Sequence, residues 1–265
     1  ELIAVAGEHD ATVIEQRFYQ LSNATDRAEA VLGLLLEKQP ASSLVFCNNK
    51  AETQQLADTL NQYACYALAL HGDMEQKERD QTLLRFANHS ATVLVATDVA
   101  ARGLDIAALD LVINFQIPRD SEVYVHRIDR TGRAGGVGCA STLCAPDEAH
   151  RLRALQDYLG RTITPEPLPD PGQLPASLPK PQMATLQIDG GKKQKLRAGD
   201  ILGALTSKEY RGNVGGEIGR DDVGKIVLQD IRAFVAVRQP VLQLALDKLR
   251  NGKMKGRSFK VRQLR

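Results

Sequence analysis

A proline-rich stretch divides this chain into two parts. Residues 164–181 have the sequence TPEPLPDPGQLPASLPKP and hold seven of the eleven prolines in the 265-residue chain. Proline fixes φ and lacks a backbone donor, so we expect neither a helix nor a sheet ladder there, but a stiff, extended linker. The sequence therefore predicts one domain over residues 1–163 and a second over residues 182–265.

The two parts carry opposite net charge. Residues 182–265 hold 18 lysines and arginines against 8 acidic residues, whereas residues 1–181 hold 16 against 24. A basic face on a small domain is typical of nucleic-acid binding, and a solvated lysine-rich surface has the same composition. Charge alone therefore favours a nucleic-acid partner for the second part without identifying it.

Composition indicates a folded protein without a membrane-spanning segment. The apolar fraction of 43% is ordinary for a folded protein, and no apolar run is long enough to cross a bilayer. The four cysteines form no Cys-x-x-Cys pair, which favours buried free thiols over metal ligands and a reducing, cytoplasmic setting. No signal peptide opens the chain, and its start at Glu1 indicates a fragment or a processed product. We expect no membrane partner and no metal site.

Short apolar runs alternate with amphipathic segments in the first part. The runs lie at 43–47, 65–70, 92–97, 111–115 and 141–145, and the segments lie near 26–38, 50–61, 75–87, 121–131 and 147–159. This alternation predicts an α/β fold with a parallel sheet covered by helices on both faces. Ligands bind such sheets where the carboxyl ends of the strands meet, and the polar residues Asn48, Asp73 and Asp98 follow strand ends.

Two strings imitate nucleotide-binding motifs. PDEAH (146–150) spells a magnesium-holding box, but no phosphate-binding loop precedes it, so we interpret Pro146, Asp147 and Glu148 as the first turn of a helix. GRDDVGKI (219–226) nearly spells the phosphate loop itself. Ile226 replaces its hydroxyl residue and a strand-like run follows, so we reject that interpretation as well.

A cluster of basic residues stands beside a glycine-rich bend in VHRIDRTGRAGG (125–136). Arginine stays protonated in proteins and matches phosphate geometry. Arg130 and Arg133 are three residues apart and would share one face of a helical turn. The cluster indicates either a salt-bridged surface helix or a site for a phosphate chain.

Four motifs in order resemble the second RecA-like domain of the DEAD-box RNA helicases. They are LVFCNNK (44–50), ALHGDMEQKERD (69–80), VLVATDVAARGLDI (93–106) and YVHRIDRTGRAG (124–135), and the resemblance covers about residues 10–160. The strings MATLQIDGGKKQKLRAGDILGALT (183–206) and GEIGRDDVGKIVLQDIRAFVAV (216–237) are similar to the RNA-recognition domain of the DbpA group of that family. The resemblance implies the C-terminal half of such a helicase, without the first RecA-like domain.

The resemblance also implies how ATP would be bound. In the family, ATP with Mg²⁺ lies between two RecA-like domains, and the absent one would supply the phosphate loop, the magnesium site and the water-activating acid. Arg130 and Arg133 match the arginine fingers, which stabilise charge on the γ-phosphate, Asp105 matches the acid on the ribose hydroxyl, and Gly103 lets the backbone approach the nucleotide. The positions that couple the two domains match His126, Arg127 and Gln76.

RNA contacts in the first domain are implied at Gly72, Arg79, Thr97 and Asp98. They are expected to reach phosphates and sugars, with Asp98 orienting donors. One position departs from the family pattern, because Asp129 stands where glycine is usual. Its carboxylate would pair with Arg130 and weaken the finger, or cap the turn.

The second domain follows the order β-α-β-β-α-β, with elements at 183–188, 197–206, 224–230, 232–238, 240–250 and 258–264. This is the order of an RNA-recognition motif, whose sheet stacks bases on aromatic residues. Phe234 fits one stacking place, or is a half-buried strand residue, while Gln187 and Arg232 stand where aromatics are expected. Binding is expected to rely more on a basic loop and tail. The predicted RNA contacts are Arg232, Phe234, Lys192, Lys193, Lys195, Arg197, Lys253, Lys255, Arg257 and Lys260.

Two functions of different class follow. The first is half of an ATP-dependent RNA helicase that is anchored on a hairpin of large-subunit ribosomal RNA and acts on pre-ribosomal particles during ribosome assembly. Hydrolysis would need the full-length protein, and this chain alone is expected to be inactive. The second is a non-enzymatic RNA-binding adaptor with a helicase-like fold. Arg130, Arg133 and Asp105 favour the helicase, and the RNA-recognition domain argues against a DNA translocase.

Overall fold

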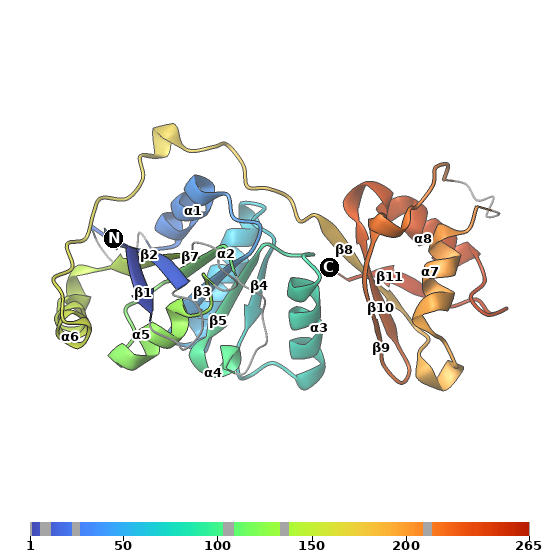
Figure 1. The fold of residues 1–265 in the computed structure, drawn as a ribbon, viewed down its shortest axis with the longest axis horizontal. Helices are drawn as coiled ribbons and strands as arrows, with labels where there is room; N and C mark the ends of the chain where they lie inside the picture. The colour runs from blue at the N-terminus through green and yellow to red at the C-terminus, as the bar shows by residue number, and fades with distance from the viewer. Residues whose placement is uncertain are drawn as a thin grey trace. The chain divides into compact units, whose positions relative to one another are not determined.

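A computed structural model describes residues 2–5, 12–22, 27–102, 109–132, 138–208 and 214–264. The chain folds into two compact units (Figure 1). Residues 1–86 and 91–180 make up the first unit, and residues 87–90 and 181–265 make up the second. None of the described helices combines the length and apolar character that a membrane span requires.

The first unit is built on a seven-stranded sheet with the strand order β1-β2-β7-β6-β3-β5-β4. β1 (Leu2–Val5) runs antiparallel to β2 (Thr12–Gln20), and the other neighbouring pairs are parallel. The five apolar runs of the sequence form the remaining strands. They are β3 (Ser43–Cys47), β4 (Ala67–Leu70), β5 (Val93–Thr97), β6 (Leu111–Asn114) and β7 (Gly138–Cys144).

Helices cover both faces of this sheet (Figure 1). α1 (Arg27–Lys38) and α2 (Lys50–Gln62) pack on the face that includes Val45 and Ile113. The opposite face includes Leu44 and Phe46 and is covered by α3 (Gln76–Ala87), α4 (Asp98–Ala101), α5 (Ser121–Ile128) and α6 (Ala149–Leu159). The predicted parallel sheet between two helical layers is therefore confirmed.

The acidic string at 146–150 serves the fold. Pro146–Glu148 forms a 3-10 turn that leads into α6, as its interpretation as a helical first turn predicts. The Glu148 carboxylate is buried and pairs with the Arg27 guanidinium at 2.5 Å and with that of Arg151 at 3.1 Å. This carboxylate therefore joins the starts of α1 and α6, and its charge is neutralised within the first unit.

The proline-rich segment is extended but not free. The N–H of Glu166 donates to the Phe18 carbonyl, and its carbonyl accepts from the N–H of Gln20, both at 2.8 Å. Leu168 and Leu178 pack against the core beneath α1, and Pro171–Gln173 forms a 3-10 turn. The segment thus forms one isolated bridge and one short 3-10 turn, and neither a sheet ladder nor an α-helix. Prolines at alternate positions leave the N–H of Glu166 available. β1 pairs only with residues 12–15 of β2, which leaves the later residues of this edge open.

The cysteines are free thiols, as predicted. Cys47, Cys65 and Cys144 are buried and Cys139 is half-buried. Burial raises the pKa of the Cys47 thiol to about 12 and that of Cys65 to about 11, because a thiolate loses hydration in the apolar core. These groups therefore remain protonated and unreactive at neutral pH.

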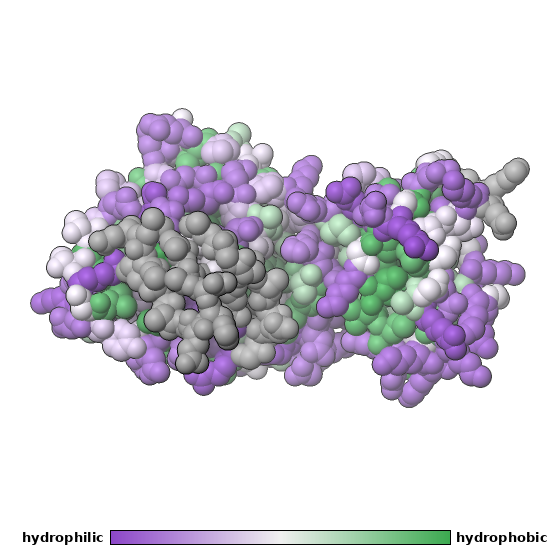
Figure 2. Space-filling model, viewed as in Figure 1, coloured by the Kyte–Doolittle hydropathy of each residue, from purple (hydrophilic) through white to green (hydrophobic). Residues whose placement is uncertain are grey.

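The second unit is a four-stranded antiparallel sheet with the order β11-β8-β10-β9. Its strands are β8 (Met183–Ile188), β9 (Val223–Leu228), β10 (Ala233–Arg238) and β11 (Val261–Gln263), and its helices are α7 (Ala198–Thr206) and α8 (Leu242–Asn251). The predicted element order is confirmed. Both helices pack on one face of the sheet, and Figure 2 shows an apolar area in the region where Figure 1 draws α7 and β9.

A buried lysine completes this packing. Lys248 on α8 donates from Nζ to the carbonyls of Leu205 and Ser207, each at 2.8 Å. These carbonyls lie at the carboxyl end of α7, where helical partners are lacking. Lys248 therefore caps α7 from the neighbouring helix and fixes the two helices against each other.

Candidate functional site

One buried arginine connects the carboxyl ends of three adjacent strands in the first unit. Arg127, near the end of α5, donates from Nε and Nη2 to the Asp98 carboxylate at 2.7 and 2.8 Å. Its other bonds reach the side-chain oxygens of Asn114 at 3.1 Å and Asn48 at 3.0 Å, and the Gln116 carbonyl at 3.2 Å. The guanidinium lies 5.1 Å from the centre of the Phe46 ring.

Arg127 is enclosed by the first unit. Its side chain is 1% exposed, and its guanidinium nitrogens donate to groups of that unit. Arg127 thereby fixes Asp98, which keeps 38% of its side chain exposed, relative to α5 and the following turn. Its role in coupling stays a prediction.

Arg130 and His126 line a small cavity of about 240 Å³ beside this arginine, together with Arg102 and Asp98. α5 ends at Ile128 with Asp129 as its C-cap residue, so Arg130 lies in the turn beyond the helix and not on the predicted helical face. The Arg130 carbonyl accepts from the N–H of Leu109 at 3.2 Å, which ties this turn to the start of β6. Three predicted nucleotide-binding residues, Gly103, Asp105 and Arg133, lie outside the described residues.

The predicted RNA contacts of the first unit follow β4 and β5. Thr97 ends β5 and is the N-cap residue of α4, and Asp98 begins that helix. Arg79 donates from Nη2 to the Ala100 carbonyl at 2.6 Å, which holds α3 against α4. Gly72 lies in the exposed turn after β4, where a Cβ would meet no atom within 4 Å. These residues gather on one edge of the sheet, as the parallel topology predicts.

Two further residues join this edge. Lys50 and Asp73 form an ion pair at 2.5 Å, and each side chain is 60% exposed. The hydrogen bond from Lys50 holds the pKa of the Asp73 carboxyl below its ordinary value. Gln76 is exposed and donates to Asp80 along α3 at 2.7 Å, and its coupling role stays a prediction.

The sequence indicated Asn48 and Asp73 by their place after strands. It missed Asn114, which is the last residue of β6, and Gln116, which lies two residues beyond it. Neither residue belongs to a polar motif that would have marked it in the sequence.

A second cavity, of about 580 Å³, lies between the starts of α1 and α2. Its walls include Arg27, Glu148 and Arg151, and also Gln116, which donates to Glu52 at 2.6 Å. These polar groups pair with one another, and Arg119 on the same wall is exposed.

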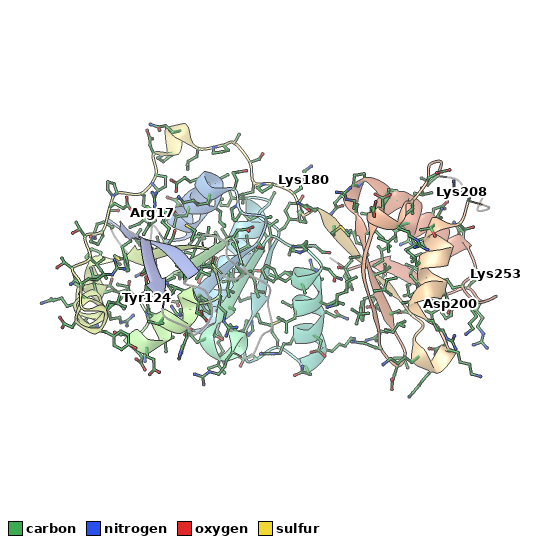
Figure 3. The ribbon with its side chains drawn as sticks, in the orientation of Figure 1. Arg17, Tyr124, Lys180, Asp200, Lys208 and Lys253 are labelled. Carbon is green, nitrogen blue, oxygen red and sulfur yellow. The ribbon has the colours of Figure 1, made fainter. Side chains whose placement is uncertain are left out.

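In the second unit, the predicted basic residues converge on three connected loops, which we call the basic edge: residues 189–197, 229–232 and 253–260. Lys192 and Lys193 donate their backbone N–H groups to the carbonyls of Gln229 and Asp230 at 2.9 and 2.8 Å. Lys255 donates from Nζ to the Lys195 carbonyl at 2.9 Å. The side chains of the lysines at 192, 193, 195, 253, 255 and 260 and of the arginines at 197 and 257 are exposed, and Figure 3 labels Lys253 on this unit.

Close packing between these loops depends on two glycines. A Cβ on Gly191 would lie 2.2 Å from the Gln229 carbonyl oxygen, and a Cβ on Gly190 would lie 2.3 Å from the Phe259 ring. Any side chain at either position would force the loops apart. The backbone of the basic edge is therefore fixed, and its exposed basic side chains extend from it.

The sheet of the second unit has a second face, which points away from its helices. Phe234 pairs across the sheet with Gln187 and Val227, and Arg262 pairs with Gln187, so these four residues form one row on that face. Arg262 is exposed at the end of this row. Phe234 stays a predicted stacking residue, and the exposed cations of the basic edge lie in the same unit.

Comparisons with known proteins agree with both units. A profile described as the helicase conserved C-terminal domain matches residues 26–135, and one described as the DbpA RNA binding domain matches residues 185–263. The ATP-dependent RNA helicase DbpA of Escherichia coli K12 is 49% identical over 254 residues, which cover 95% of this chain and 53% of the relative. The protein of the same name from Bacillus subtilis 168 is 31% identical, over 86% of this chain and 50% of the relative.

Solved structures show the same likeness. The crystal structure of the E. coli DEAD-box protein SrmB, bound to RraA, is 31% identical, with a TM-score of 0.56 over 63% of this chain and 98% of that chain. The present chain spans about half the length of the curated relatives that it matches.

Proposed function

Because the chain belongs to the DEAD-box RNA helicases of the DbpA type, we propose that its first unit completes the ATP site of an RNA-stimulated ATPase. Arg127 carries this proposal, because it joins the RNA-facing residue Asp98 to the turn that holds Arg130. RNA contact and phosphate contact would thus be made by one rigid edge of the first unit.

The role of Arg130 follows from the chemistry of phosphoryl transfer. Charge develops on the transferred phosphoryl group, and positioned cations stabilise it more in the transition state than in the ground state. Arg130 and Arg133 would supply these cations from this unit, Asp105 would bind the ribose hydroxyl, and Gly103 would allow close approach of the backbone.

The remaining groups that ATP needs belong outside this chain. By resemblance to the family, we assign the Mg²⁺ site, the phosphate loop and the water-activating acid to a first RecA-like domain.

We further propose that the second unit anchors the enzyme on a hairpin of large-subunit ribosomal RNA, so that the helicase core acts on neighbouring duplexes in pre-ribosomal particles of the cytoplasm. The exposed cations of the basic edge support this proposal, since phosphate neutralisation supplies much of the affinity of RNA-binding proteins. The first unit would contact RNA phosphates and sugars through Gly72, Arg79 and Thr97, with Asp98 orienting them.

ATP turnover distinguishes the helicase from a non-enzymatic adaptor. In the protein with both RecA-like domains, RNA should stimulate ATP hydrolysis, whereas this chain alone should not hydrolyse ATP. Absence of RNA-stimulated turnover in the longer protein would leave only the adaptor, and robust turnover by this chain alone would contradict the assignment of its domains.

A further inference from the structure

The turn between β9 and β10 displays an apolar side chain within the basic edge. Ile231 is 53% exposed, against 37% for Val214, the other large exposed apolar residue among the described residues of the second unit. Its neighbours in the turn are Asp230 and Arg232, and Lys193 is bonded to that turn through the backbone. An exposed aliphatic group thus lies in the same turn as Arg232 and next to the loop of Lys193.

The fold does not require isoleucine at this position. The N–H of Gln229 donates to the Arg232 carbonyl at 2.8 Å, which closes a tight turn around Asp230 and Ile231. Tight hairpin turns favour Gly, Asn and Asp, and β-branched residues fit extended strands better. Ile231 also takes no part in the hydrophobic core of the second unit. The reason for this side chain therefore lies outside the stability of the fold.

The turn is held rigidly by the neighbouring loop. Lys192 and Lys193 bond to the carbonyls of Gln229 and Asp230, and Gly191 lies directly beneath them without room for a Cβ. A contact made by a side chain on a fixed turn loses little conformational entropy on binding. Ile231 is therefore presented in one place relative to the surrounding lysines.

We propose that Ile231 packs against the face of an unpaired RNA base and makes the second unit prefer looped RNA over a continuous duplex. This inference rests on the proposed RNA anchoring by the same unit. Unpaired bases offer an apolar face that duplex stacking hides, while phosphates are present in both kinds of RNA. The lysines bind either RNA through phosphates, and Ile231 contributes only where a base is accessible.

The test compares one stem in two forms. The probes are an RNA hairpin with an unpaired loop and a blunt duplex of the same stem sequence, with affinity for the 265-residue chain measured by fluorescence anisotropy at fixed salt. Ile231→Ser should weaken hairpin binding about five- to tenfold, because apolar contact is lost, and should leave duplex binding unchanged. Ile231→Phe should retain hairpin binding. Val214→Ser is the matched control and should change neither affinity.

The outcomes separate this inference from the anchoring on which it rests. A hairpin preference that survives Ile231→Ser, or an equal loss on hairpin and duplex, would overturn the role of Ile231 and leave anchoring intact. A wild-type chain that binds hairpin and duplex equally would overturn hairpin anchoring itself and, with it, this inference. Circular dichroism of each variant confirms that the second unit remains folded.

Discussion

The two units hold their positive charge in opposite ways. Arg127 is enclosed in the first unit and bonded to three strand ends, while the lysines of the basic edge are exposed and held together mainly through their backbone. An enclosed cation fixes geometry and is little affected by salt, whereas exposed cations contribute affinity that salt screens. The charge in the first unit therefore fixes the positions of site residues, and the charge in the second unit attracts a polyanion.

The largest effect is expected on ATP turnover when Arg130 is replaced. In the protein with both RecA-like domains, Arg130→Ala should lower RNA-stimulated turnover by about three powers of ten, because a cation facing the transition state is lost. Steady-state ATPase assays at saturating RNA measure this. Arg119→Ala, an exposed arginine on the wall of the larger cavity, is the control and should retain activity. Comparable turnover in both variants would remove Arg130 from the site.

Loss of the enclosed Arg127 guanidinium should lower the stability of the first unit strongly. Arg127→Met leaves the Asp98 carboxylate and two side-chain amides without their shared donor, and should lower the free energy of unfolding by about 3–5 kcal/mol. Thermal unfolding followed by circular dichroism measures the loss, with the exposed Arg153→Met as control. The loss should persist at 1 M salt, and a loss that disappears at high salt would show that Arg127 acts as a surface charge.

A smaller stability effect is expected from Lys248. Lys248→Met removes the donor to the carbonyls of Leu205 and Ser207, and should destabilise the second unit by about 1–3 kcal/mol. Urea denaturation of the two proteins measures the difference, with the exposed Lys208→Met as control (Figure 3).

The contribution of Lys248 to stability should increase with pH. Desolvation lowers the pKa of Lys248 in the folded state below its ordinary value. Between the folded and the unfolded pKa, the folded protein therefore binds fewer protons than the unfolded chain. Wild-type stability should therefore rise as pH increases through this interval below 10.5, relative to Lys248→Met. A wild-type advantage that falls over the same interval would contradict this assignment.

Sequence periodicity was sufficient for most of the fold because buried parallel strands are continuous apolar runs, such as 43–47 and 93–97. It missed β2, which mixes Glu15 and Arg17 with apolar residues, and the antiparallel β1 beside it. It also missed the contacts of Glu166, because the open edge of β2 is a property of the assembled sheet. A linker prediction from proline content could not include a partner strand that was itself missed.

Motif spacing identified most residues of the candidate site, but not how they act. Arg127 precedes Arg130 and Arg133 in the same basic cluster, and only the folded strand ends show that its side chain is enclosed. Likewise, the sequence indicated which lysines matter in the second unit. It could not show that Gly190 and Gly191 bring those lysines against the turn that presents Ile231.

The smallest expected change is in the salt dependence of RNA affinity when exposed lysines of the basic edge are replaced. Replacing Lys192, Lys193 and Lys195 with alanine should make the log–log salt dependence of RNA affinity shallower by up to about three contacts, each worth about 0.7 to 0.9 in slope. Titration of affinity against salt measures the slope. Replacing Arg119, Arg153 and Lys180 of the first unit, which are exposed and were not predicted to contact RNA, removes equal charge and should leave the slope nearly unchanged. An unchanged slope in the 192–195 variant would mean that RNA binds elsewhere.

We propose that the second unit anchors the protein on a particular RNA hairpin while the first unit contacts RNA without preference. The most direct measurement is the affinity of this chain for the large-subunit ribosomal hairpin and for a scrambled hairpin of equal length, across a range of salt concentrations. We predict parallel salt dependences with a constant offset of at least about tenfold in favour of the ribosomal hairpin, because phosphate contacts are shared and base contacts are not. Equal affinities at every salt concentration would reduce the second unit to a basic tether and contradict the claim.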